Sequence, residues 1–264
     1  MQPGDAPADT RSKYRVEALA KGLAVLSLFS ERQTSLMLKQ ICEATAMPMA
    51  TAFRVIATLE EDRYLERLPD GSYRPSIGVL TLGYAALSGL DLVEHSQLLL
   101  RDLAQSTNET VNVGSLVGDR VLYLVRIRNA DLVTANIQVG STLPAVHTSM
   151  GKVLLSELDP IDLKQRLDPA SFTDGTGPNA VRTVEQLEKS FLAVRRQGYA
   201  IQDQEVAHGL RSIACPIRGK NGTIIAAANI AVQASQYTTT EMVRRFRSPL
   251  RETCDEVTHR LSLV

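Results

Sequence analysis

The 264-residue chain lacks tryptophan, and only 5% of its residues are aromatic. Its three cysteines, Cys42, Cys215 and Cys254, lie far apart and form no CxxC pair or Cys/His cluster. This spacing argues against a zinc ribbon or a disulfide framework and indicates a reducing compartment. GxGxxG, P-loop and HExxH motifs are also missing. We therefore expect no metal site and no bound cofactor.

The chain also lacks a net charge and a long apolar run. Its 29 basic residues balance 29 acidic ones, which argues against a histone-like protein that binds nucleic acid by charge alone. No apolar stretch approaches the ~18–20 residues of a membrane span. Residues 1–14 contain no apolar signal core and are expected to form a disordered leader. These features predict a cytoplasmic protein with no membrane partner.

Residues 15–77 have the order of a winged helix-turn-helix. Helices are expected at about 16–29 and 38–46, and a third from Pro48 to about residue 61. Pro48 suits the first turn of that helix, where its missing N–H is no loss. Asp70-Gly71 between two short alternating runs then predicts a β-hairpin, which would be the wing.

The third helix is the one expected to read double-stranded DNA. If Phe53, Ile56 and Leu59 face the core, the opposite face is presented to the major groove. Threonine and arginine can contact phosphates or base edges there, and alanine permits close approach. Arginines of the wing would meet the DNA backbone. The candidate DNA-binding residues are Met49, Ala50, Thr51, Arg54, Thr58, Arg67 and Arg74.

Residues 78–92 predict a linker helix, which is too apolar for a solvated spacer and should lie in an interface. From 93 to 264, strand pairs alternate with helices, which predicts an α+β domain with a mostly antiparallel sheet. Capping boxes at Thr183 and Thr238 mark two helix starts. Strands are expected at 111–117, 121–127, 132–139, 199–204, 211–218 and 223–232.

Several segments resemble the IclR family of bacterial transcription regulators. They are KGLAVLSLF from Lys21, MATAFRVIATLE from Met49, DGSYRPS from Asp70, LPAVHTSMGKVLLS from Leu143 and GYAIQDQEVAHGLRSIACPI from Gly198. Within the family, these sequences most resemble the branch of protocatechuate and β-ketoadipate pathway regulators. The resemblance implies a non-enzymatic homodimer on operator DNA, often a dimer of dimers, with a C-terminal domain that binds a small effector.

The resemblance also implies an effector pocket. Carried over by position, its residues would be Ser149, Met150, Gln202, Leu210, Ser212, Asn229 and Ala231. Family members often have an acidic residue in place of Gln202 and a cysteine in place of Ser212, which leaves the ligand's identity open.

The residues themselves favour an organic acid as the effector. Arg126 or His147 could bind an anion, and the helix start near Ser149 offers free N–H groups. A neutral Gln202 removes a like-charge repulsion. The branch suggests an aromatic acid or a dicarboxylate derived from it. With five Phe and no Trp, few aromatic side chains are available to stack on a ring, so a small aliphatic acid remains an alternative effector.

Other interpretations stay open at this point. Arg126 could instead pair with an acid such as Glu205, and Lys152 could be solvated. Cys215 with a nearby histidine could suggest an enzyme with a regulatory helical module, although its place in a strand before Pro216 is typical of a buried hydrophobe. A winged-helix adaptor that binds proteins is a further alternative.

Overall fold

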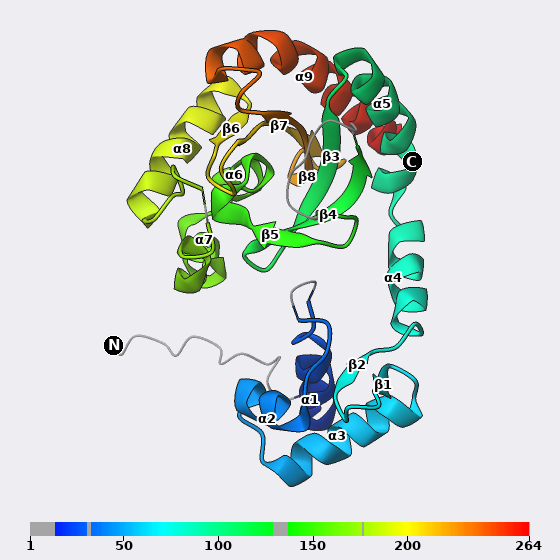
Figure 1. Ribbon diagram of the computed structural model, residues 1–264. Coiled ribbons are helices and arrows are strands. Elements are labelled where there is room, and N and C mark those ends of the chain that lie inside the picture. Colours follow the sequence, from blue (N-terminus) through cyan, green and yellow to red (C-terminus); the bar gives the residue numbers. More distant parts are fainter. Residues whose placement is uncertain (1–13, 31–32, 129–136, 176, 264) are drawn as a thin grey trace, which may run out of the picture. The chain divides into compact units, whose positions relative to one another are not determined.

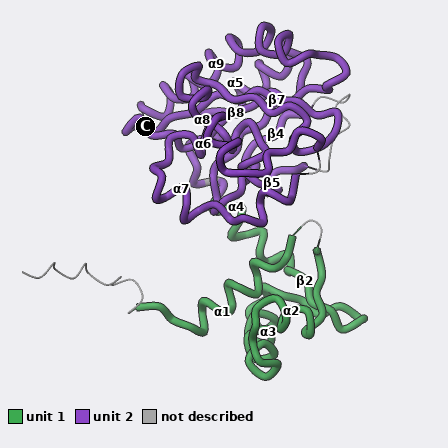
Figure 2. The backbone as a smooth tube through the Cα atoms, turned by 90° about the vertical axis from the view of Figure 1, so that its left-hand side faces the viewer, with its two compact units in different colours: residues 1–86 green, residues 87–264 purple. Residues whose placement is uncertain are grey.

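The computed structural model describes residues 14–30, 33–128, 137–175 and 177–263. The chain divides into two compact units, residues 1–86 and 87–264, with the boundary inside the segment expected to be a linker (Figure 2). The expected leader lies outside the described residues except for Tyr14, and most of the expected strand at 132–139 also lies outside them. Among the described helices, none combines the length and the apolarity needed to cross a lipid bilayer.

Unit 1 is a three-helix module with a two-stranded wing (Figure 1). Ala46, in the left-handed conformation at φ 52°, ends the second helix, and Pro48 precedes the third. At the wing's turn, Asp70 accepts a hydrogen bond from the Ser72 N–H, and Gly71 has φ +84°. The elements are α1 (Glu17–Leu26), α2 (Leu38–Thr45), α3 (Met49–Glu61), β1 (Leu65–Arg67) and β2 (Tyr73–Pro75).

The expected core face of α3 is wrong at one position. Phe53 is 53% exposed, whereas Ala52 and Ile56 are buried. The packed stripe is Ala52, Val55, Ile56 and Leu59, which has the i, i+3, i+4, i+7 spacing of a helix face against its neighbours. Phe53 lies one residue beyond that stripe, so α3 turns it out to solvent.

Unit 2 is built on a six-stranded sheet in which every neighbouring pair is antiparallel. The strand order is β5-β4-β3-β8-β7-β6. Helix α4 (Val79–Ser88) spans the boundary between the units. The strands are β3 (Thr110–Val117), β4 (Arg120–Ile127), β5 (Thr142–Pro144), β6 (Ala200–Asp203), β7 (Leu210–Arg218) and β8 (Ile224–Gln233). The helices are α5 (Asp91–Thr107), α6 (Ser149–Ser156), α7 (Pro160–Arg166), α8 (Val184–Gln197) and α9 (Thr239–Leu263), with short 3-10 turns η2 (Ala145–His147) and η3 (Pro169–Phe172).

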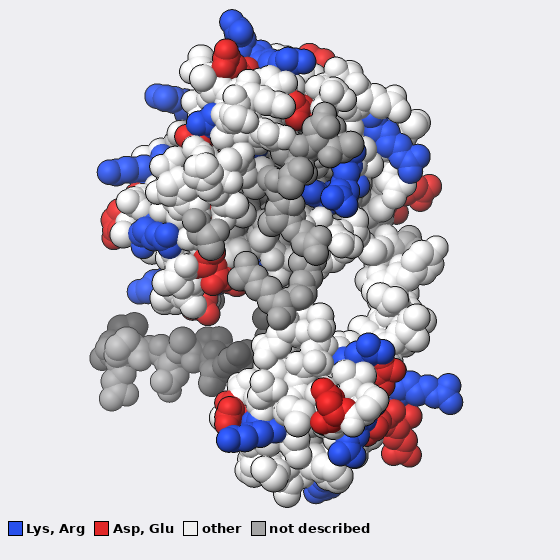
Figure 3. All heavy atoms as spheres, viewed as in Figure 1, with Lys and Arg blue, Asp and Glu red and all other residues white. Residues whose placement is uncertain are grey.

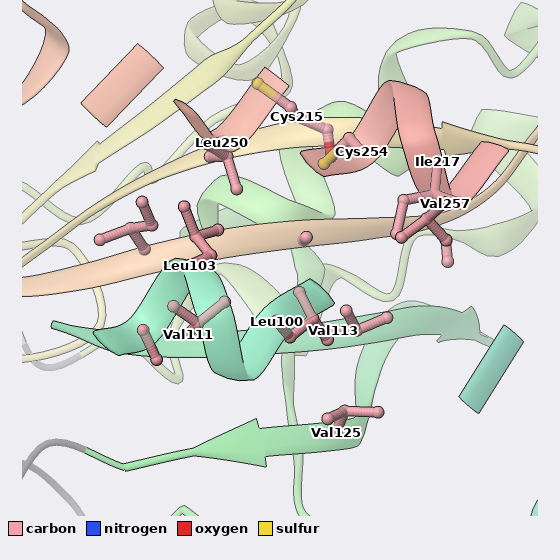
Figure 4. Packing of buried hydrophobic residues seen from close by; sticks show 14 of the residues in the cluster. Leu100, Leu103, Val111, Val113, Val125, Cys215, Ile217, Leu250, Cys254 and Val257 are labelled. Carbon is pink, nitrogen blue, oxygen red and sulfur yellow. The ribbon is translucent and has the colours of Figure 1, made fainter. Parts of the chain in front are cut away.

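Helices cover both faces of this sheet. One face packs on α5 and α9, where Cys215 and Ile217 of β7 lie near Leu250, Cys254 and Val257 of α9 (Figure 4). The other face packs on α6, which in turn packs on α8. Because successive strand side chains point to opposite faces, the even-numbered residues of β7 face α6.

Both capping boxes are tied to helix starts. Thr238 and Glu241 exchange hydrogen bonds at the start of α9, and the Thr183 hydroxyl accepts from the Gln186 N–H at the start of α8. These local contacts satisfy N–H groups that a helix otherwise leaves unpaired.

A close backbone approach explains one glycine. Helix α6 lies so near η2 that a Cβ atom on Gly151 would overlap the carbonyl group of Ala145. The helix start therefore requires glycine at this position, because the obstacle is backbone that cannot rotate away.

We expect Gly151→Ala to destabilise unit 2 by about 1–3 kcal/mol, because the added methyl group must push α6 away from η2. Thermal unfolding of the full chain measures this as a lower Tm. Gly22→Ala in α1 is the control, since a Cβ there meets nothing within 4 Å. Equal melting temperatures for both variants would contradict the close approach.

Candidate functional site

The sheet register gathers polar side chains on the face that α6 covers. Asn112 of β3 pairs with Arg126 of β4 on one side and with Asn229 of β8 on the other. Two residues after Asn229 in β8, Ala231 pairs with Ser212 of β7, which in turn pairs with Gln202 of β6. Five polar residues from five strands thus form two adjacent rows on one buried face.

These rows surround a small cavity of about 20 Å³, which is room for about one water molecule. Its walls combine the polar rows with apolar side chains from the loop after β6 and from the segment before α6. The lining residues are Asn112, Tyr123, Arg126, Ile137, Leu143, Thr148, Gln202, Val206, Leu210, Ser212, Asn229 and Ala231.

Hydrogen bonds order the first row. The Arg126 guanidinium donates to Asn112 Oδ1 at 2.9 Å, and Asn112 Nδ2 donates to Asn229 Oδ1 at 2.8 Å. Arg126 Nε and Gln202 Nε2 are buried donors without a partner. Among the described residues, no carboxylate forms an ion pair with Arg126. Burial lowers the pKa of the Arg126 guanidinium. An arginine keeps its proton in such places, so the cavity offers a positive charge and spare donors.

The structure brings most of the predicted effector residues together. Arg126, Gln202, Leu210, Ser212, Asn229 and Ala231 line the cavity. Ser149 lies behind them, with its hydroxyl 2.7 Å from that of Ser212. Met150 instead packs in the core between α6 and the sheet.

His147 does not line the cavity either. It lies in η2, 1% exposed, close to Gly175. Burial lowers the pKa of His147, so it does not supply a positive charge at neutral pH. The anchor for an anion is therefore Arg126 rather than His147.

Two expectations around α6 need correction. The Gly151 N–H donates to the Thr148 hydroxyl at 2.8 Å, so the helix start is capped by its own chain and offers fewer free N–H groups than expected. Lys152 is not solvated: it is buried, and its ammonium lies 2.5 Å from a Glu205 carboxylate oxygen. Glu205 thus pairs with Lys152 and not with Arg126, and burial raises the pKa of Glu205.

Sequence reasoning missed several lining residues. Asn112 carried a usable signal, because it is a polar residue at an inward position of the apolar run TVNVGSLV. Tyr123 and Val206 carried none, since aromatic and aliphatic residues in such places are ordinary core. Thr148 is a residue type typical of a helix cap, and in the structure its hydroxyl caps α6.

The predicted DNA-binding residues lie on α3 and the wing. Met49, Ala50, Arg54 and Thr58 are exposed and Thr51 is half-buried. The Thr58 hydroxyl donates to the Arg54 carbonyl of its own helix. In the wing, Arg74 pairs with Glu66 across the strands, and Arg67 lies over the Tyr73 ring. Arg54 makes no ion pair with any described residue, so its charge is free for a phosphate or a base.

Catalytic and metal chemistry find no support in the described residues. No group of three or more His, Cys, Asp or Glu side chains is placed there to hold a metal ion. Cys215 is 1% exposed, and burial raises the pKa of its thiol to about 12. A nucleophilic cysteine needs the opposite shift.

Comparisons with known proteins agree with this division into two units. The IclR helix-turn-helix model matches residues 18–69, and the model of the IclR C-terminal domain matches residues 84–259. The Pca regulon regulatory protein of Pseudomonas putida is 35% identical over 92% of this chain and 84% of its own length.

Solved structures share the fold. An IclR family regulator from Brucella abortus superposes with a TM-score of 0.83 at 24% identity, covering 97% of both chains. An IclR homologue from Microbacterium hydrocarbonoxydans, solved with 4-hydroxybenzoate, has a TM-score of 0.73 at 25% identity and covers 94% of this chain and 100% of its own. The chain therefore belongs to the IclR family of bacterial transcription regulators, which are not enzymes, with an N-terminal helix-turn-helix DNA-binding domain and a C-terminal effector domain.

Proposed function

We propose that this regulator responds to a small organic acid held in the polar cavity of unit 2. The observation that carries the proposal is a half-buried arginine, Arg126, whose buried Nε has no partner, in a cavity that Gln202 lines with a second unpartnered donor. A buried charge is costly unless a partner compensates it, and a carboxylate accepts two N–H groups of one arginine.

The comparisons support an aromatic acid or a dicarboxylate derived from one. A relative that is 35% identical regulates the Pca regulon, and a structural neighbour was solved with 4-hydroxybenzoate. Tyr123, Leu143 and Leu210 supply apolar wall for a ring or chain, and the Ser212 and Asn229 side chains can bind hydroxyl groups. The cavity holds about one water, so the ligand has to open it as it binds.

Arg126→Met should abolish the response to acids. We expect wild-type protein to be stabilised by 4-hydroxybenzoate, protocatechuate or β-ketoadipate, by about 2.7 kcal/mol at a hundredfold excess over Kd. In thermal unfolding, the neutral 4-hydroxybenzamide should give no shift of the Tm. Arg196→Met, which removes an exposed arginine of α8, is the control and should keep the full shift. Stabilisation by neutral compounds alone would show that the cavity is not an anion site.

We propose that unit 1 binds operator DNA through α3 and the wing, which places the protein in the bacterial cytoplasm. Met49, Ala50, Thr51, Arg54 and Thr58 would lie along the major groove. Arg67 and Arg74 would approach the backbone, with Arg74 already partly neutralised by Glu66.

Arg54→Ala should weaken binding to the protein's own upstream DNA by about 1–3 kcal/mol if Arg54 contacts a base edge. Gel shifts at several salt concentrations measure this, with Lys189→Ala in unit 2 as the control. A loss with unchanged sequence preference would mark a phosphate contact. Absence of any salt-sensitive, sequence-selective binding would favour a protein-interaction adaptor instead.

We also propose that the chain is a homodimer, and a dimer of dimers where two such pairs join, held in part by unit 1. A groove of about 950 Å³ is lined by Leu19 and Leu23 of α1 and Leu82 of α4. Thr51, Arg54 and Thr58 of α3 line its other side, so the proposed chain–chain contact is confined to α1 and α4. Its lining residues Leu19, Leu23 and Leu82 are all more than half exposed, and so is Tyr84 of α4. Large apolar side chains gathered on one exposed surface favour a protein–protein interface.

Light scattering at micromolar concentration should give a mass of two or four chains. Leu82→Glu should lower that mass, because a charge in an apolar interface must be desolvated without a partner. Ile161→Glu, at an apolar position of unit 2 that is also more than half exposed, should leave the mass unchanged. A wild-type mass of 28.8 kDa, that of one chain, would rule the dimer out.

A further inference from the structure

Unit 2 carries a second, larger concavity that the effector cavity does not share. It lies between α7, η3 and α8, has a volume of about 1,020 Å³, and has no lining residue in common with the cavity over the sheet. Its floor consists of buried apolar side chains, chiefly Leu163, Phe172 and Phe191. Leu192 stands on its wall and is 68% exposed.

The charged residues around this groove are mostly cationic. Lys164, Arg182 and Arg195 line it against a single acid, Glu188. In the view of Figure 3, basic side chains, with acidic ones among them, follow the side of unit 2 where Figure 1 places α7 and α8. An anion at the groove therefore meets more attraction than repulsion.

The cations differ in how they are held. Arg182 donates from both terminal nitrogens to the carbonyls of Phe172 and Gly175, each at 2.9 Å, so it is fixed in the groove wall. Arg195 donates from Nε to the Ser156 carbonyl, which leaves its terminal nitrogens for a ligand. The Lys164 ammonium makes no hydrogen bond or ion pair with any residue in the described part of the chain.

We propose that this groove binds a second organic anion, with an apolar body on the Phe172–Phe191 floor and a carboxylate or sulfonate at Lys164 and Arg195. The groove's volume is at the upper end of the range for small-molecule sites, roughly 300–1,000 Å³. Its apolar floor rewards burial of a ring or alkyl chain. The ligand class is thus a hydrophobic acid larger than one that would fit beside Arg126.

The two anion sites are physically separate. The effector cavity is lined by strands of the sheet and by the segment that precedes α6, whereas the groove is lined by α7, η3 and α8, and the two share no lining residue. Substitution of Arg126 should therefore leave the groove's affinity for its anion unchanged. A negative binding result at one site does not contradict the proposal for the other.

The test uses 1-anilinonaphthalene-8-sulfonate, an aromatic anion that fluoresces in apolar sites, with the full-length chain. We expect saturable binding that decanoate displaces and decanol at equal concentration does not. Lys164→Glu and Leu192→Asp change exposed lining residues and should weaken the displaceable binding by about tenfold, since each puts a negative charge beside the anion.

Matched controls are available on the same helices. Ile161→Asp and Lys189→Glu make the same changes at exposed positions that do not line the groove, and they should keep wild-type affinity. The proposal fails if lining and control variants lose affinity equally, if decanol competes as well as decanoate, or if Arg126→Met removes the displaceable binding.

Discussion

The register of β3 against both of its neighbours is the constraint on which the effector site depends. Asn112 stands opposite Arg126 and opposite Asn229 at once. Two polar side chains of the β3–β4 hairpin therefore meet, in one row, a third that lies 117 residues from Asn112 in the chain. Because side chains alternate along a strand, a slip of one residue would send Asn112 into the apolar face under α5 and α9. The valines on either side of it, Val111 and Val113, hold the register by packing in that face.

Burial then gives this row its chemical character. In water, Arg126 would be one solvated cation among many, and its hydrogen bond to Asn112 would contribute little. In the cavity the Arg126 Nε is shielded from solvent, so an unpaired donor is costly and an anion that satisfies it gains more. The small volume of the cavity fits this view, because its walls leave room for only about one water beside these polar groups.

Much of the fold could be predicted from the sequence, because caps, turns and periodicity act locally. The Thr238–Glu241 box, the Asp70-Gly71 turn and the alternating strands lie where the local pattern put them. The predictions that were wrong concern tertiary packing. Phe53 and Ala52 are neighbours on α3, and only packing against the other helices decides which one is buried. The partner of Lys152 was likewise hidden, since Glu205 is 53 residues away in the chain.

That buried pair also limits how the cavity can open. Lys152 of α6 bonds to Glu205 and to the Ile201 carbonyl, while the Gly177 N–H donates to the Glu205 carbonyl. The chain is therefore fixed to α6 up to residue 205. Breaking a buried ion pair costs about 3–5 kcal/mol, which a small ligand cannot readily supply. Leu210 is fixed in turn by its place in β7. An effector that enters the cavity is therefore expected to leave the Lys152–Glu205 pair and the strands of the sheet in place.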